Sequence, residues 1–382
     1  MRRKVTMGDL GTIITGNTPP RSMPELYGDY TPFVKATDIS ESEKYTYTPE
    51  ECYSKEGHDK YIRSLVPKGS TCVVTIGSIG KKMTMAHCDL FINQAMNAII
   101  PNENFDNEFV YYAVKNVLSN IKGLDSGTAS GRENVSKSAF SRMEVVVDDD
   151  LIIQQRIATI LSRYDSLIEN YQKQIKLLEE AAQRLYKEWF VDLHFPGHEN
   201  TKIVDGVPEG WELSKLGSLA EFKRGKTITK KDIVDGSIPV VAGGLEPAYY
   251  CDKSNTAERV ITVSGSGANA GFTRMYFEKV WASDCSYADL ETTQFLHFVY
   301  CFLKDNKTTI DNMQKGAAQP HVYAKDINAL ELYIPTEDVL ITYERNVSRY
   351  FNSILSLQSQ IRLLTEARDR LLPKLMSGEI KA

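Results

Sequence analysis

One helical phrase occurs twice in this chain, and it limits the possible folds more than any other feature. Residues 174–185 read QIKLLEEAAQRL and residues 360–371 read QIRLLTEARDRL, with eight of twelve positions identical at a separation of 186 residues. A chain of 382 residues is long enough for more than one domain. Because the separation is about half of that length, the sequence predicts two copies of one structural unit.

Both copies lie in long stretches of heptad spacing. Apolar residues recur at steps of four and three over residues 157–189, and the same phase returns over residues 343–375, with Arg368 as the one misfit. The core-facing stripe of an ordinary helix is much shorter, so a run of about five heptads is more typical of a coiled coil. The predicted seam consists of Ile157, Leu161, Tyr164, Ile168, Tyr171, Ile175, Leu178, Leu185, Tyr343, Val347, Tyr350, Ile354, Leu357, Ile361, Leu364 and Leu371.

The ends of both helices are marked in the sequence. Acidic residues stand in DDDL at 148–151 and in TEDV at 336–339, where a helix N-terminus favours negative charge. Pro373 is expected to limit the second helix near its end, because proline lacks the N–H that the helix ladder needs. Each helix would hold about 35 residues and span about 50 Å.

The duplication extends into the segments that precede the helices. VTIGSIG (Val74–Gly80) is matched by ITVSGSG (Ile261–Gly267). Short β-branched runs with glycine and proline predict β-rich globules. The predicted fold class is therefore α+β, with two β-rich globules separated by two long helices that pair as an antiparallel coiled coil with pseudo-two-fold symmetry. The predicted boundaries are 1–148 for the first globule, 149–190 for the first helix, 191–206 for a linker, 207–335 for the second globule, and 336–382 for the second helix and the tail.

Composition excludes several classes of protein. No run approaches 18 apolar residues and the first residues lack the apolar region of a signal peptide, so we expect a cytoplasmic protein with no membrane contact. The six cysteines are scattered without a CxxC pair, which predicts neither a disulfide framework nor a zinc site. The net charge of −5 argues against a nucleic-acid partner, but EFKRGKTITKK at 221–231 holds five cations against one anion.

Catalytic motifs are incomplete. NTPPR (Asn17–Arg21) has an inserted Thr and no aromatic residue where an amino-methyltransferase needs one. AEFKRGKT (Ala220–Thr227) has Ala220 where a P-loop needs its first glycine. His194 and His198 are separated by Pro and Gly, so they share no helical face for a metal. We therefore expect no catalytic residue, no metal site and no cofactor bound by this chain.

Several segments resemble the DNA specificity (S) subunit of type I restriction-modification systems. They are the opening LGTIITGNTPP with GDYTPFVKATDI, the central FVDLHFPGH with GVPEGWELSKLGSL, and the final RLLPKLMSGEI. The resemblance covers essentially the whole chain. One departure is that Gln154 and Gln155 stand where the family has EQ before its first conserved helix, and the usual Pro is missing there.

The resemblance implies a non-catalytic subunit of a larger complex. Each globule would be a target-recognition domain that reads one half of a bipartite, asymmetric site on double-stranded DNA. The paired helices would set the spacing between the halves and dock two methyltransferase (M) subunits, and restriction (R) subunits would join the assembly. S-adenosylmethionine, ATP and Mg would belong to those partners.

Such a role needs exposed Lys and Arg for phosphates, and Arg, Asn, Gln, Ser or Thr for base edges. The candidates in the first globule are Thr18, Arg21, Lys35, Lys81, Lys82, Ser130, Arg132 and Asn134. The candidates in the second globule are Lys223, Arg224, Lys226, Lys230, Asn269, Arg274, Gln319 and His321. The like charges in KRGK favour phosphate contacts there.

Two other classes of protein stay open at this point. One is a self-contained methyltransferase or nuclease with its own recognition domains, against which the incomplete catalytic motifs count. The other is a coiled-coil adaptor without a DNA role. The basic segment and the divergence of the two globules count against that alternative.

Overall fold

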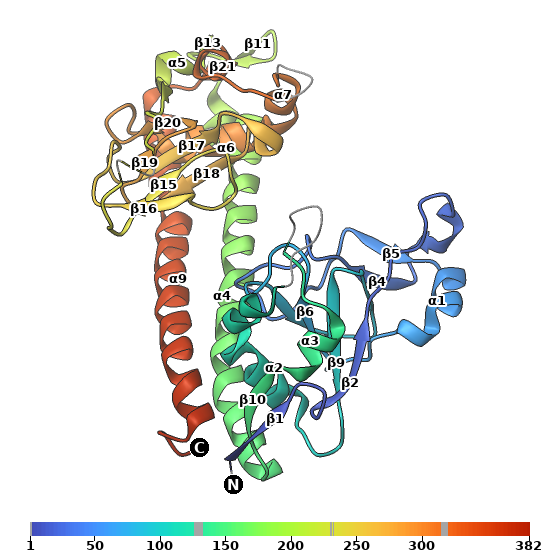
Figure 1. Cartoon of the computed structure of the whole chain (residues 1–382). Helices are drawn as coiled ribbons and strands as arrows, with labels where there is room; N and C mark the ends of the chain where they lie inside the picture. The colour runs from blue at the N-terminus through green and yellow to red at the C-terminus, as the bar shows by residue number, and fades with distance from the viewer. Residues whose placement is uncertain (1, 126–132, 230, 232, 315–319) are drawn as a thin grey trace. The chain divides into compact units, whose positions relative to one another are not determined.

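The computed structural model describes residues 2–125, 133–229, 231, 233–314 and 320–382 (Figure 1). The chain divides into two compact units: unit 1 is Met1–Gln172 with Gln360–Ala382, and unit 2 is Lys173–Ser359. Each unit therefore contains one globule and a part of each long helix. Within the described ranges, none of the helices has the length and hydrophobicity needed to cross a membrane.

Unit 1 is built around three small sheets. Its strands are β1 (Arg2–Thr6), β2 (Gly11–Thr15), β3 (Tyr27–Gly28), β4 (Thr31–Val34), β5 (Glu51–Tyr53), β6 (Thr71–Val74), β7 (Met83–Met85), β8 (Phe91–Ile92), β9 (Met96–Pro101) and β10 (Glu144–Asp148). The antiparallel sheet has the order β2-β9-β6-β7, and a mixed sheet has the order β3-β5-β4-β8 with β4 and β8 parallel. The third sheet pairs β1 with β10.

The short helices of unit 1 are α1 (Lys55–Tyr61), α2 (Asn107–Asn116) and α3 (Lys137–Arg142). A Ser or Asp side chain caps the start of each and accepts a hydrogen bond from a first-turn N–H, as Asp106 does from Phe109 (2.9 Å). Residues 109–114 of α2 are all buried. A helix that is buried all round belongs in a core, and α2 shares one apolar cluster with β10 and the start of the first long helix.

Unit 2 repeats this design. Its strands are β11 (Ile203–Val204), β12 (Val207–Pro208), β13 (Glu212–Lys215), β14 (Lys223–Arg224), β15 (Ile238–Val241), β16 (Tyr249–Cys251), β17 (Val260–Ser264), β18 (Thr273–Tyr276), β19 (Trp281–Ala282), β20 (Cys285–Asp289) and β21 (Glu331–Ile334). Its short helices are α5 (Leu216–Leu219), α6 (Leu296–Asp305), α7 (Lys307–Asn312) and α8 (Ala324–Asn328).

The main sheets of the two units correspond, although β3 of unit 1 and the β11–β12 pair of unit 2 have no counterpart in the other unit. The order β14-β20-β17-β18 repeats β2-β9-β6-β7, and the parallel pair β15–β19 repeats β4–β8. The pairing of β13 with β21 repeats that of β1 with β10, and α6 stands at the place of α2 in the element order. The predicted α+β class with two β-rich globules and two long helices is confirmed. The predicted two-fold symmetry stays a prediction.

Hydrogen bonds of the backbone correct the sequence match between the units. Gly77 and Gly267 each donate an N–H to the loop that precedes α3 or α8 (3.0 Å and 3.1 Å), and both have a positive φ. Gly77 therefore corresponds to Gly267, and the match of Val74–Gly80 with Ile261–Gly267 was three residues out of register. Both stretches mix β-branched residues with glycine, so similar letters fit more than one register.

The two long helices exceed their predicted length. Helix α4 (Leu151–Phe190) has 40 residues and α9 (Glu337–Ser377) has 41. The prediction that Pro373 limits α9 is wrong, because the proline lies inside the helix. Gly378, with φ at +86°, follows the last helical residue, and a glycine in this left-handed conformation commonly ends a helix.

The long helices pack antiparallel within each unit. In unit 1, Leu161 of α4 shares a buried cluster with Leu372 of α9. In unit 2, the rings of Trp189 and Tyr343 lie 5.6 Å apart, while Leu178 lines one hollow with Leu357. In both units the residue numbers rise along one helix as they fall along the other (Figure 1).

None of the predicted seam residues is exposed. The buried ones are Ile157, Leu161, Ile168, Tyr343, Val347 and Ile354, and the half-buried ones are Tyr164, Tyr171, Ile175, Leu178, Leu185, Tyr350, Leu357, Ile361, Leu364 and Leu371. Every seam position from 171 to 178 and from 357 to 364 is half-buried. A pair of helices covers a side chain on one side only, which explains this middle stretch.

The seam misfit Arg368 forms a buried ion pair. Its Nη1 lies 2.5 Å from Oδ1 of Asp165 on α4, and Oδ2 of Asp165 accepts a hydrogen bond from the Tyr112 hydroxyl on α2 (2.5 Å). Both charged residues are less than a tenth exposed. At the corresponding positions of unit 2, 186 residues away in each case, stand Phe351 and Ala182. One interface position is therefore ionic in unit 1 and apolar in unit 2.

Candidate nucleic-acid interface

Two candidate cations of the first globule are held by its own carboxylates. The Arg21 guanidinium donates to both carboxylate oxygens of Glu51 (2.6 Å and 3.0 Å) and lies 4.7 Å from the centre of the Tyr27 ring. Lys35 pairs with Glu50 and lies 3.4 Å from Glu51. A phosphate would have to displace these carboxylates, so neither cation is poised for DNA.

The other described candidates of the first globule differ in accessibility. The Thr18 hydroxyl donates to Gln94, and Nζ of Lys82 lies 3.4 Å from a backbone carbonyl. Lys81 is exposed and makes no ion pair within the described part of the chain. Asn134 is half-buried, and its backbone N–H donates to a carboxylate (2.7 Å). The candidates that lie outside the described residues are Ser130, Arg132, Lys230 and Gln319.

The basic segment of the second globule lies on an edge strand. Lys223 and Arg224 form β14, which stands beside β20 at the end of the strand order in the described sheet, and both are exposed. Adjacent strand residues point to opposite faces of a sheet, so the two side chains do not form one patch. Lys226 follows the strand and is also exposed.

Two further candidates of the second globule are partly engaged. Arg274 donates to the carbonyl of Leu245 (2.8 Å) and lies 3.5 Å from a carboxylate oxygen of Glu246. Asn269 is half-buried in a short 3-10 helix after β17. Arg274 is therefore already paired with a carboxylate, as Arg21 and Lys35 are.

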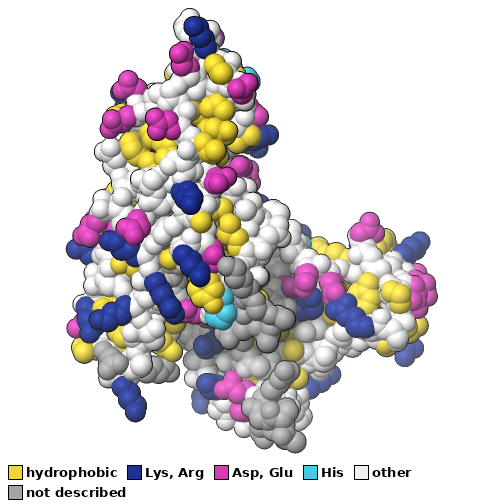
Figure 2. All heavy atoms as spheres, turned by 90° about the horizontal axis from the view of Figure 1, so that it is seen from above, with side chains coloured by type: hydrophobic (Ala, Val, Ile, Leu, Met, Phe, Trp, Pro, Cys, Tyr) yellow, Lys and Arg dark blue, Asp and Glu magenta, His cyan; other side chains and the backbone are white. Residues whose placement is uncertain are grey.

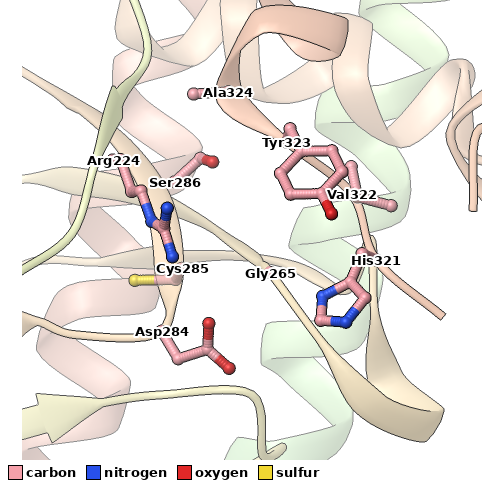
Figure 3. A pocket seen from close by; sticks show the side chains of 9 residues that line it. All are labelled: Arg224, Gly265, Asp284, Cys285, Ser286, His321, Val322, Tyr323 and Ala324. Atoms are coloured by element: carbon pink, nitrogen blue, oxygen red, sulfur yellow. The ribbon is translucent and has the colours of Figure 1, made fainter. Parts of the chain in front are cut away.

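Arg224 and His321 meet at one hollow of about 270 Å³ (Figure 3). Asp284 and Tyr323 also line it. The rings of His321 and Tyr323 stack at 5.9 Å with an angle of 12° between their planes. Sequence reasoning selected Arg224 and His321 for their chemistry but missed Asp284 and Tyr323. No sequence pattern around Asp284 or Tyr323 indicates a role in this hollow, because the sheet topology brings these residues together from distant segments.

The surface seen in Figure 2 is not uniformly basic. On that face, Lys and Arg side chains are interspersed with Asp and Glu, in agreement with the net charge of −5. Nucleic-acid contact would therefore depend on particular side chains and loops.

His194 and His198 do not form a metal site of the usual kind with the residues that the structure describes. Nδ1 of His194 lies 2.8 Å from a carboxylate oxygen of Glu188, and Nδ1 of His198 lies 2.8 Å from a backbone carbonyl. Among the described residues, no group of three or more His, Cys, Asp or Glu side chains is arranged to hold a metal ion.

Comparison with known proteins places the chain in a family. Residues 3–180 and 208–342 match the model of the type I restriction modification DNA specificity domain. The chain therefore belongs to this family, as its segments predicted.

Two curated relatives support the assignment. The MjaIX specificity subunit of Methanocaldococcus jannaschii, from a type I restriction enzyme, is 27% identical over 98% of this chain and 92% of its own length. The HindI specificity subunit of Haemophilus influenzae is 30% identical over 45% of this chain and 38% of its own length.

A solved structure shows the same fold. The S subunit of the type I restriction-modification system from M. genitalium superposes with a TM-score of 0.56 at 19% identity, covering 98% of this chain and 96% of that one. At this identity the likeness concerns the fold alone.

Proposed function

We propose that the two globules of this specificity subunit each read one half of a bipartite, asymmetric site on double-stranded DNA. In this proposal residues 1–148 and 207–335 are the target-recognition domains. The helices set the distance between the half-sites and dock two M subunits, and R subunits join the complex. The chain itself is non-catalytic and works in the cytoplasm, with S-adenosylmethionine, ATP and Mg bound by its partners.

The observation that carries the two-reader proposal is one scaffold with different side chains. The isolated bridge between Ile76 and Asn134 in unit 1 recurs in unit 2 between Ser266 and His321. The backbone contact is thus the same, while an amide stands in one globule and an imidazole in the other. Two copies of a scaffold with different polar groups are suited to read different sequences.

Methylome sequencing tests this proposal. Cells that carry this chain with its M subunit should methylate two short sequences separated by a fixed number of unspecified base pairs, and the two sequences should differ. Cells without the chain are the control and should lack that methylation. A continuous palindromic motif would contradict the proposal.

The docking proposal is supported by a stripe of identical residues in both long helices, which includes one exposed leucine in each. Leu177 is 63% exposed and its counterpart Leu363 is 60% exposed. Each belongs to a stripe at spacing i, i+3, i+7, i+10, formed by Gln174, Leu177, Ala181 and Arg184 in α4 and by Gln360, Leu363, Ala367 and Arg370 in α9. Helix pairing explains why three of the four seam positions in this stretch are also identical, whereas folding constrains exposed positions such as Leu177 and Leu363 only weakly. Identity on the outside therefore favours one partner that binds twice.

In unit 2 this stripe borders a hollow that fits the same role. Leu177 lines it together with Leu178 and Leu357, and its volume is about 490 Å³. An exposed leucine beside a partly apolar hollow is suited to an apolar contact on a partner's surface.

Single charges in the stripe test the docking. Leu177→Asp and Leu363→Asp should each reduce the number of bound M subunits from two to one, and the double variant should bind none, as measured by native mass spectrometry. Leu167→Asp is the matched control, because Leu167 is 44% exposed but its counterpart is Ser353. Unchanged stoichiometry in the double variant would rule out this stripe as the docking face.

A further inference from the structure

We infer that the hollow lined by Arg224, Asp284, His321 and Tyr323 reads one G·C base pair within the half-site of the second globule. This inference rests on the proposed function, since it requires that the globule contacts DNA. It assigns the residues that determine specificity and the base pair that they select.

The side chains of the hollow have unused hydrogen-bonding capacity. Figure 3 shows the Arg224 guanidinium and the Asp284 carboxylate on the same side of the hollow, with Cys285 between them in the view. Within the described residues, the Arg224 side chain makes no hydrogen bond or ion pair, and Asp284 uses one oxygen, Oδ2, to accept from the Ser266 hydroxyl. Oδ1 of Asp284 and the donors of Arg224 are left for a ligand.

This arrangement distinguishes Arg224 from other candidate cations. Arg21 and Lys35 are paired with carboxylates, and Arg274 is held by a carbonyl and a nearby carboxylate. Binding DNA through those side chains requires breaking interactions that the free protein already has. Within the described residues, Arg224 has no such interaction to break.

At the position that corresponds to this hollow, the first globule has the same backbone hydrogen bonds but different side chains. Gly16 and Gly225 each donate an N–H to the neighbouring strand, β9 or β20 (3.2 Å and 2.8 Å). Thr15 therefore occupies the position of Arg224. Thr75 and Gly265, the residues after β6 and β17, each donate an N–H to the residue that precedes β9 or β20. Ala95 therefore occupies the position of Asp284.

The polar groups of the first globule satisfy each other at this place. The Thr15 hydroxyl donates to Asn97 (2.6 Å), and the Asn97 amide donates to the Thr75 hydroxyl (3.0 Å). Asn97 is only 2% exposed. This closed network leaves little to offer a base, so the hollow is a feature of the second globule.

The chemistry of the hollow matches the major-groove edge of one base pair. Guanine presents the acceptors N7 and O6, which a guanidinium contacts with two hydrogen bonds, and cytosine presents the N4 amino donor, which a carboxylate accepts. Arg224 and Asp284 together supply this complement. An A·T pair would set the adenine amino group against the guanidinium, so the hollow favours G·C.

The test measures base preference in the complete complex of this chain with its M subunits. Binding is compared on DNA in which each base pair of each half-site is varied in turn. Arg224→Lys keeps the charge but loses the two-pronged donor, and should reduce discrimination at one G·C pair by about 5- to 150-fold. Asp284→Asn should reduce it at the same pair. The other half-site and the gap should stay unchanged.

Two controls separate this effect from a loss of charge or of structure. Lys279→Ala removes an exposed cation beyond β18, at the opposite end of β17 from the hollow, and should leave all preferences unchanged. Thr15→Val alters the corresponding position of the first globule and should not change any preference in the half-site that Arg224→Lys affects. Thermal unfolding of each variant confirms that the globule is folded.

Each result decides a different statement. If folded Arg224→Lys and Asp284→Asn complexes keep every base preference, or lose it at an A·T pair, the hollow does not read G·C, while the proposed function stands. If the wild-type complex shows no bipartite preference at all, the proposed function itself fails.

Discussion

Arg368→Met should strongly destabilise unit 1. The change removes the cation that faces Asp165 and leaves this carboxylate buried, with the Tyr112 hydroxyl as its remaining donor from the contacts described above. The two charged residues are 5% and 7% exposed, so solvent screening is weak.

The expected loss follows from this burial. Removing one partner of a buried ion pair costs about 3–5 kcal/mol, because the other charge stays without compensation. Whole domains are stable by about 5–15 kcal/mol. The single substitution should therefore remove a large part of the free energy of unfolding of unit 1.

Unit 2 supplies the design for a rescue. There the corresponding positions hold Phe351 and Ala182 in an apolar cluster. The triple variant Asp165→Phe, Arg368→Ala and Tyr112→Phe copies that pair and removes the third polar group. Apolar replacements of buried ion pairs are often neutral or stabilising, so the triple variant should be more stable than Arg368→Met.

The assay is urea unfolding followed by two signals. Circular dichroism reports helices of both units, whereas all three tryptophans (Trp189, Trp211 and Trp281) lie in unit 2. Arg368→Met should move the dichroism transition more than the fluorescence transition. Arg370→Met is the matched control: it breaks an exposed pair with Glu366 (2.6 Å) and should cost less than about 1 kcal/mol. An equally small loss for Arg368→Met would refute the reasoning.

Three further predictions concern charge, length and DNA affinity. Burial, with a smaller effect of a nearby guanidinium, lowers the pKa of Lys115 from 10.5 to about 8. Between these two pH values the unfolded chain holds a proton that the folded chain lacks, so the free energy of unfolding should rise with pH. Lys115→Met should abolish that rise, as measured by urea titrations at pH 7.5 and 9.5. Inserting one heptad after both Leu178 and Ile354 preserves the seam and adds about 10 Å to the paired helices. Methylome sequencing should then return the same half-sites with a gap longer by about three base pairs. An unchanged gap would show that the helices are not the spacer. Lys223→Ala with Lys226→Ala should weaken binding to all sequences alike and lower the slope of log affinity against log salt by up to about two units, measured by salt titration.

The helices were predictable because a heptad pattern is local and its period survives in the sequence. Even in the helices, the spacing of apolar residues did not predict the partner of one buried residue. Arg368 is a misfit in the pattern, and its partner Asp165 lies 203 residues earlier. The prediction that Pro373 limits α9 was wrong for a different reason. A proline in the last turns of a helix removes few hydrogen bonds, so packing around it keeps the helix intact.

The site was less predictable because availability depends on contacts between distant segments. Arg21 and Arg224 are both cations near the start of their globules. Among the residues that the structure describes, Arg21 pairs with a carboxylate, that of Glu51, which lies 30 residues further along the chain, and Arg224 pairs with none. Asp284 and Tyr323 join the hollow through strand and loop placement. The positions of Lys and Arg in the sequence therefore indicate candidate DNA contacts, and the fold determines which of these side chains are available.

The ionic position in unit 1 gives the two copies separate identities. If two first halves of the chain paired through α4 in the same register, each Asp165 would face Ala182 of the other molecule. If two second halves paired through α9, each Arg368 would face Phe351. Both self-pairings lack the Asp165–Arg368 ion pair, so that Arg368 keeps its pair with Asp369 (2.8 Å) and Asp165 keeps the hydrogen bond from Tyr112. The pairing of α4 with α9 brings the two buried charges together. The ion pair therefore favours pairing of the two different helices over pairing of either helix with its own copy.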